Sequence, residues 1–426
     1  MRNFKKLLVV ICVLALLTAS CVFAALAATA GNVSTLNAYI EAAEAATDGV
    51  AKYNAIMSAV EYCKTVPQYE EGYDMAKERL ANLCLAGADV LLTAVDVNGL
   101  KADDAYDKMM KADELLEVYD LTGLEGYESV TVKYDSALVR AVGVLVKACD
   151  ANVDTNLKTA PNGIAVKKVN SILTYCTPFG DPSVLDAAKA EFAPLEEAQK
   201  RAEQMNYAAL DDSNSISNYD LPIFFTETWE DRNVGMESSA LGGRWTIDLK
   251  GIANKMGILQ DPTGNKYMVH RYLEKENPQS SYTQIGLGTH KVDNSEGIVF
   301  EFDITTFGKV PEKGMIIETG SVAGAYFPPP YFAINGNGDI CKNDKSTVAL
   351  SGAIVKGQWT HIVIVLKPDD FVYHLYVDGQ FICEYDAKYE GKTRYDHSKV
   401  AFRISGQHST SGEIAVDNIK IYGGDS

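Results

Sequence analysis

The hydrophobic pattern of this chain changes its period once, near residue 212. Between residues 31 and 212, apolar side chains recur at spacings of three and four, which is typical of amphipathic helices. Beyond residue 220, apolar and polar residues alternate in short runs, which is typical of β-strands. The polar stretch at 213–220 has neither period and is typical of a linker. The sequence therefore predicts a multidomain α and β chain, all-α over 31–212 and all-β over 221–426.

The first 30 residues have the features of a secretory signal peptide. Arg2, Lys5 and Lys6 precede a long apolar run, and small residues surround Ala27 and Ala30, where cleavage is expected. We therefore expect a secreted protein or one at the cell surface. Retention of the leader as a membrane anchor is the alternative, and no later segment is apolar enough for a second span.

The mature chain is strongly acidic. Without the three basic residues of the leader, the formal charge of −18 becomes −21. A surface of this sign repels phosphate backbones and anionic lipids, so binding to nucleic acid or to a membrane surface is not expected.

The helical part has an internal repeat. An apolar stripe runs through Tyr73, Leu80 and Gly87, and a similar frame recurs from Tyr134 onward. This spacing predicts a helical repeat module, an antiparallel array or bundle of hairpins. Because the part has no histidine and its carboxylates lie on predicted solvent faces, we expect a spacer or a surface for a protein partner without catalytic residues.

The cysteines of the mature chain are far apart and form no C-x-x-C motif, which argues against a zinc or redox site. Most are expected to be buried free thiols that pack as small hydrophobic side chains. A disulfide between Cys341 and Cys383 is the open alternative, because both lie on predicted strands of one domain.

The all-β part consists of many short strands at close spacing, which predicts a two-sheet sandwich. Asn335-Gly336 and Asp378-Gly379 lie between such runs and predict tight hairpin turns, because these residues tolerate a positive φ.

Several motifs of the β part resemble laminin G-like and concanavalin A-like jelly-roll domains. Residues 357–364 (GQWTHIVI) and 373–380 (YHLYVDGQ) are similar to the central hairpin of these domains, and residues 414–422 (IAVDNIKIY) to their closing strand. Residues 224–235 are similar to the first strand of bacterial members. The resemblance implies a jelly-roll sandwich over about half of the chain. It implies no single function, since the fold hosts lectins, hydrolases, lyases and adhesion modules.

The resemblance favours a non-catalytic, lectin-like protein that binds a polysaccharide or glycoconjugate. An aromatic and proline-rich segment, residues 325–331 (AYFPPPY), supports this interpretation, because prolines restrict the loop and aromatic rings offer sugars an apolar face. Further stacking or hydrogen-bonding residues are expected in other loops. The candidate ligand-binding residues are Tyr326, Phe327, Tyr331, Trp245, Arg271 and Tyr272. A protein-binding adhesion or structural role is the first alternative.

A jelly-roll glycoside hydrolase or lyase is the second alternative. Glycosidases of this fold carry Glu-x-Asp-x-(x)-Glu on one strand, and this chain has Glu301 and Asp303. Thr305 and Thr306 occupy both possible positions of the last carboxylate, so the usual general acid is missing. We therefore expect Glu301 and Asp303 to be ordinary outward residues of a strand, and His361 a strand-edge residue.

The resemblance also implies a structural calcium ion where the first and closing strands meet. The candidate metal ligands are Glu230, Asp231 and Asp417. Calcium prefers six to eight hard oxygen ligands, which carboxylates and backbone carbonyls provide.

Overall fold

The computed structural model describes most of the chain after the leader. The described residues are 31–150, 160–213, 223–236, 245–248, 254–272, 281–286, 298–312, 314–319, 330–342, 346–367, 372–386, 399–404 and 412–423. Within these ranges, no helix is long and apolar enough to cross a membrane.

The part N-terminal to residue 213 is helical, as predicted. Its helices are α2 (Val33–Ala45), α3 (Gly49–Cys63), α4 (Tyr73–Val95), α5 (Ala102–Glu117), α6 (Tyr127–Asp150), α7 (Ala160–Tyr175) and α8 (Ser183–Ser213). The first two begin at side-chain caps: Asn32 Oδ1 accepts from the Thr35 amide at 2.8 Å, and Asp48 Oδ1 accepts from the Ala51 amide at 2.9 Å.

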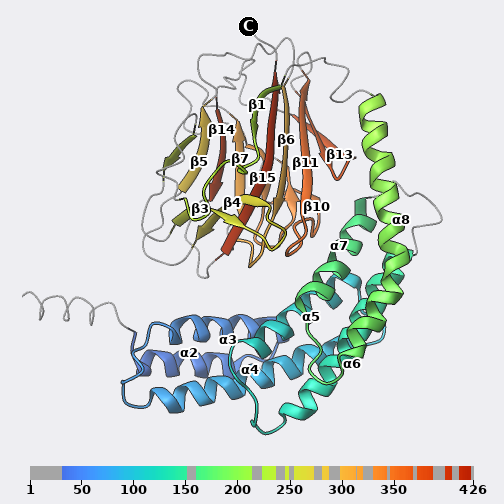
Figure 1. The fold of residues 1–426 in the computed structure, drawn as a ribbon. Helices are drawn as coiled ribbons and strands as arrows, with labels where there is room; N and C mark the ends of the chain where they lie inside the picture. The colour runs from blue at the N-terminus through green and yellow to red at the C-terminus, as the bar shows by residue number, and fades with distance from the viewer. Residues whose placement is uncertain are drawn as a thin grey trace, which may run out of the picture. The chain divides into compact units, whose positions relative to one another are not determined.

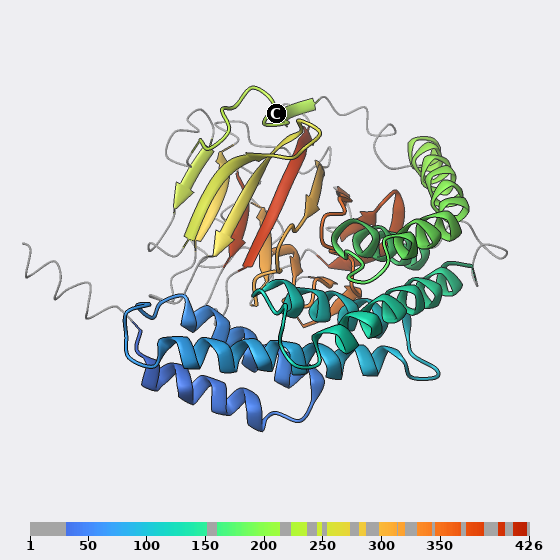
Figure 2. The ribbon, with the colours of Figure 1, turned by 60° about the horizontal axis from the view of Figure 1, so that its bottom comes forward.

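Helices α2, α3 and α4 lie side by side in both ribbon views (Figure 1, Figure 2). Gly87 on α4 permits this close approach, because a Cβ at this position would meet Ile56 Cδ1 at 2.6 Å and Leu115 Cδ1 at 3.0 Å. The apolar stripe predicted from Tyr73 onward faces this core, where Leu80 is fully buried.

The chain divides into two compact units, and the division lies inside the helical part. The first unit ends at Asp96 and resumes over Lys108–Tyr134. The second unit comprises Val97–Asp107 and all residues from Asp135 onward, so it includes α7, α8 and the β part.

The β part is a two-sheet antiparallel sandwich, which confirms the fold class predicted from the sequence. Figure 1 labels many of its strands. One sheet has the order β13-β12-β11-β6-β15-β4-β3, with β1 also paired to β15, and the other has the order β10-β9-β8-β7-β14-β5-β2. The strands are β1 (Ile223–Glu227), β2 (Trp245–Asp248), β3 (Asn254–Gln260), β4 (Lys266–Tyr272), β5 (Ser281–Gly286), β6 (Ile298–Thr305), β7 (Met315–Thr319), β8 (Pro330–Ile334), β9 (Ile340–Cys341), β10 (Val348–Leu350), β11 (Thr360–Lys367), β12 (Val372–Val377), β13 (Gln380–Asp386), β14 (Lys399–Ile404) and β15 (Gly412–Gly423).

The core lies between the two sheets. Phe302 of β6 stacks on Phe332 of β8 with ring centroids 6.0 Å apart, and both side chains are fully buried. Cys341 is buried and Cys383 is half-buried, and neither forms a disulfide.

One of the two predicted hairpin turns is tight and the other is longer. Asp378-Gly379 directly joins β12 to β13, with φ values of 49° and 78°. The Asn335-Gly336 pair instead opens a loop over 335–339, in which Gly338 has the positive φ of 76°. The side chain of Asn335 accounts for this difference, because its Oδ1 accepts from the amides of Asn337 and Asp339 and holds a wider turn.

Candidate functional site

Strand β6 places two carboxylates on the outer face of the eight-stranded sheet. Phe300, Phe302 and Ile304 point into the core, and Glu301 and Asp303 alternate with them and point away from it. Their side chains keep 12% and 20% exposure, so both are half-buried rather than freely solvated.

The register of the sheet decides which side chains meet these carboxylates. Asp303 lies opposite His361 on β11 and opposite Asp417 on β15. Glu301 lies opposite Val363 on β11 and Lys420 on β15. The outward side chains therefore form two neighbouring rows perpendicular to the strands, one containing Asp303 and the other containing Glu301.

An irregularity in β15 adds a further hydrogen-bond donor to the row that contains Asp303. The register shifts between Asp417 and Lys420, and Asn418 has a φ of 50° within this bulge. The Asn418 amide donates to Asp417 Oδ1 at 2.7 Å, and its side chain donates to Asp303 Oδ2 at 2.7 Å. The extra residue thus aims an amide group at Asp303.

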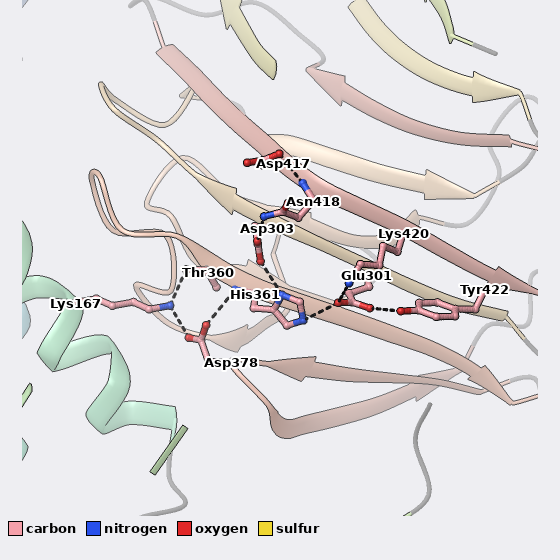
Figure 3. Close-up of polar contacts among 10 residues, drawn as sticks. All are labelled: Lys167, Glu301, Asp303, Thr360, His361, Asp378, Asp417, Asn418, Lys420 and Tyr422. Atoms are coloured by element: carbon pink, nitrogen blue, oxygen red, sulfur yellow. Dashed lines mark hydrogen bonds and ion pairs between the residues drawn. The ribbon is translucent and has the colours of Figure 1, made fainter. Parts of the chain in front are cut away.

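Figure 3 shows a connected group around the imidazole of His361, here called the His361 cluster. His361 Nδ1 is 2.6 Å from Asp303 Oδ1, and its Nε2 is 3.6 Å from Glu301 Oε1. Lys420 Nζ donates to Glu301 Oε1 at 3.1 Å, and the Tyr422 hydroxyl donates to Glu301 Oε2 at 2.8 Å. The members of the cluster are Glu301, Asp303, His361, Asn418, Lys420 and Tyr422.

The charges of the cluster change the pKa of two groups. Burial acts to lower the pKa of His361, but the hydrogen bond to Asp303 and the nearby charges of Asp303, Glu301 and Asp378 outweigh it and raise the pKa. Burial raises the pKa of Asp417 to about 6, although amide donors from Asn265 and Asn418 oppose the change. The site therefore contains a histidine whose pKa is raised above 6.5 and a carboxyl group whose pKa is about 6.

Aromatic side chains border the cluster on the same sheet face. Tyr376 lies opposite Val363, in the row of Glu301, and packs with Tyr422 against the buried Val299 and Val363. Phe381 lies opposite Tyr376, with ring centroids 5.6 Å apart, and is 53% exposed. A polar centre next to partly exposed rings suits a ligand with both hydroxyl groups and an apolar face.

Trp359, which directly precedes β11, belongs to a separate apolar cluster. Its ring packs edge-on against Tyr267 at 5.7 Å and Phe307 at 6.0 Å.

The predicted ligand-binding residues are distributed over both sheets. Tyr326 and Phe327 lie outside the described residues. Tyr331 is in β8 and Trp245 is in β2, both in the seven-stranded sheet, whereas Arg271 and Tyr272 end β4 in the other sheet. Trp245, Arg271 and Tyr272 are thus on strands, not in loops as expected from the sequence. Arg271 pairs with Glu413 of the neighbouring strand at 2.6 Å.

Glu230 and Asp417, two of the predicted calcium ligands, interact electrostatically, and a lysine binds the backbone beside Glu230. Glu230 contributes to the electrostatic environment of Asp417, which is 1% exposed. Lys266 Nζ donates to the carbonyl oxygens of Glu230 at 2.6 Å and Arg232 at 2.9 Å. Two backbone carbonyls beside the predicted ligands are thus bonded to an ammonium group, and the calcium ion stays a prediction. No three metal-ligating side chains are grouped within the described part of the chain.

Sequence reasoning missed the site because it treated the members singly. Taken alone, His361 is expected to be a strand-edge residue, and Glu301 and Asp303 are expected to be ordinary outward residues of a strand. The Glu-x-Asp spacing was the available signal, since alternate residues share a face. The partners on β11 and β15 become visible only with the register.

Comparisons with known proteins give a likeness of fold. No protein-family model matches the chain, and no curated protein matches it. Among solved structures, the carbohydrate recognition domain of Emp47p is 8% identical, with a TM-score of 0.32, over 48% of this chain and 97% of that domain.

Two further solved structures cover the same half of the chain. Domain 4 of AbnA, an extracellular arabinanase from Geobacillus stearothermophilus in complex with arabinotriose, is 14% identical with a TM-score of 0.30, over 48% of this chain and 94% of that domain. A sialidase is 12% identical with a TM-score of 0.35, over 46% of this chain and only 18% of its own length.

The described residues form a helical part followed by a two-sheet antiparallel sandwich, as the sequence predicts. The sandwich carries the His361 cluster on the outer face of its eight-stranded sheet.

Proposed function

We propose that the sandwich binds a neutral polysaccharide or glycoconjugate at the His361 cluster, and that the protein does so after export. The observation that carries the proposal is the pair of half-buried carboxylates, Glu301 and Asp303, held by donors on both sides. Each carboxylate has more acceptor positions than the protein donors use, so sugar hydroxyl groups can donate to the remainder.

The neighbouring rings support the same ligand class. Tyr376, Phe381 and Tyr422 provide apolar faces that stack on the C–H faces of sugar rings at low entropic cost. The acidic surface of the chain disfavours anionic glycans, because like charges repel. The proposal therefore names neutral sugars rather than sialylated or sulfated ones.

We propose a binding function without catalysis. Thr305 is fully buried and Thr306 is 3% exposed, so neither position offers a carboxylic acid or an accessible hydroxyl beside Glu301. A glycosidase of the retaining type needs a general acid on the other side of the scissile bond.

Titration calorimetry of the full chain against plant, host and bacterial oligosaccharides tests the proposal. Glu301→Gln and Asp303→Asn are expected to weaken binding about tenfold each, because hydrogen bonds to charged acceptors are the stronger ones. Glu312→Gln, in an exposed loop, is the matched control and should bind like the unaltered chain. Release of sugar products that Glu301→Gln abolishes would overturn the non-catalytic part. Absence of binding to every glycan would reject the function and favour a protein partner.

A further inference from the structure

A lysine from outside the sandwich contacts the turn beside the His361 cluster. Lys167 of α7 donates from Nζ to Asp378 Oδ2 at 2.5 Å and to Thr360 Oγ1 at 3.1 Å (Figure 3). The two charged side chains are only 11% and 16% exposed. Solvent screens a pair this well buried less than a surface ion pair, and removal of one partner would leave the other charge buried and uncompensated.

Other residues of α7 hold the helix at this end of the sandwich. Ile164, three positions before Lys167 and on the same helix face, joins the hydrophobic core of the sandwich. Lys356 Nζ lies 4.5 Å from the ring centre of Tyr175. A Cβ on Gly357 would meet the Tyr175 hydroxyl at 2.1 Å, so the Tyr175 side chain lies directly against the backbone of Gly357. The position of Lys167 is thus fixed by contacts on either side of it.

Asp378, the partner of Lys167, also forms two hydrogen bonds with the backbone of His361. Its amide donates to the carbonyl oxygen of His361 at 2.8 Å, and its Oδ1 accepts from the His361 amide at 3.0 Å. The tight turn, in which Asp378 has a φ of 49°, places this carboxylate beside the start of β11. These bonds extend the pairing of β11 and β12 by one residue, so that Asp378 lies opposite His361.

The charges around His361 come from four elements. Glu301 and Asp303 of β6 and Asp378 of the turn are the acidic groups that act on the imidazole. Lys420 of β15 is bonded to Glu301, and Lys167 of α7 is bonded to Asp378. Asp417 of β15 acts electrostatically with Asp303. Each lysine thus compensates one of the carboxylates that surround the imidazole.

We infer that Lys167 is a positioning residue of the binding site: it holds and neutralises Asp378, which fixes His361 between Glu301 and Asp303. The consequence for ligand affinity rests on the proposed function. The consequence for the protonation of His361 does not depend on that function, so the two consequences can be tested separately. Displacement of α7 weakens the site although α7 itself does not contact the ligand.

The test compares full-length Lys167→Met, Lys167→Arg and the control Lys189→Met, which removes an exposed lysine of α8. The pKa of His361 is measured by NMR, with the signal assigned by His361→Gln. Lys167→Met is expected to raise this pKa, because Asp378 then acts on the imidazole uncompensated. Its glycan dissociation constant is expected to increase about fivefold. Lys167→Arg keeps the positive charge and should leave the His361 pKa and the glycan dissociation constant near those of the unaltered chain. Lys189→Met should change neither quantity.

Lys167→Gln serves if Lys167→Met does not fold, because its amide still donates to Asp378 without a charge. An unchanged pKa and an unchanged dissociation constant in either folded variant would overturn the inference. If the unaltered chain binds no glycan, the proposed function fails, and the NMR titration still decides whether Lys167 controls His361.

Discussion

His361 Nδ1 lies 2.6 Å from Asp303 Oδ1, and the two residues are directly opposite each other on β11 and β6. The pairing explains why the pKa of this histidine is raised although the side chain is largely buried. It also ties the orientation of the imidazole to that of a carboxylate which the sequence interpretation treated as solvated.

Asp303→Asn is expected to lower the pKa of His361, because an amide neither attracts the imidazolium as a charge nor accepts its proton as strongly. NMR titration of the His361 signal measures the change. Glu312→Gln, the control, should leave the pKa of His361 unchanged. A titration of Asp303→Asn that coincides with the unaltered chain would contradict the assigned pairing.

Acidification should destabilise the sandwich through His270, which is fully buried in β4. Burial lowers its pKa from 6.5 to about 4. A lowered folded-state pKa contributes stability that is present above pH 6.5 and is lost as the pH falls through about 4. The full effect is roughly 3 kcal/mol. Denaturant unfolding of His270→Leu against pH should show a flatter profile in this range than that of the unaltered chain, and coinciding profiles would contradict the prediction.

Asp417 should act in the opposite direction. Its pKa is raised to about 6, so its stabilising contribution is complete below the ordinary value of 3.8 and is lost as the pH rises through about 6. We expect Asp417→Asn to unfold with a free energy that no longer decreases between pH 4 and pH 7, a change of roughly 2 to 3 kcal/mol relative to the unaltered chain. A parallel pH profile for the two chains would show that the carboxyl group is not perturbed.

Gly87→Ala should destabilise the first compact unit. Alanine normally favours a helix by about 1 kcal/mol over glycine. Here the added methyl group meets Ile56 and Leu115 at or below 3.0 Å, and overpacking of a core costs about 1 to 3 kcal/mol. Gly143→Ala, on α6 with open space around its Cβ, is the control and should be neutral or stabilising. Thermal melting followed by circular dichroism distinguishes the two.

The calcium prediction can be tested on the full chain. If Glu230, Asp231 and Asp417 hold an ion, chelation lowers the melting temperature and Asp417→Asn abolishes that effect, because bound ligands stabilise the folded state. A melting temperature that chelation leaves unchanged would reject the ion and leave Lys266 as the cation at this position.

The sequence alone determined the two fold classes and several local features. The change from a period of three and four to a period of two is a property of consecutive residues, and it separates helices from strands without tertiary information. Asp378-Gly379 likewise predicts its own turn, because the requirement for a positive φ is local. Both features concern residues that are neighbours in the chain.

Only the tertiary structure decided which residues form the candidate site. Glu301 and Asp303 are readable as alternate residues of a strand, but His361 meets them through the register of β11 and β6, and Lys420 and Tyr422 through β15. The bulge at Asn418 and the contact from Lys167 join segments that are far apart in the chain. Hydrophobic periodicity gives the face on which a residue lies and not its cross-strand partner, because register is set by the packing of the whole sheet.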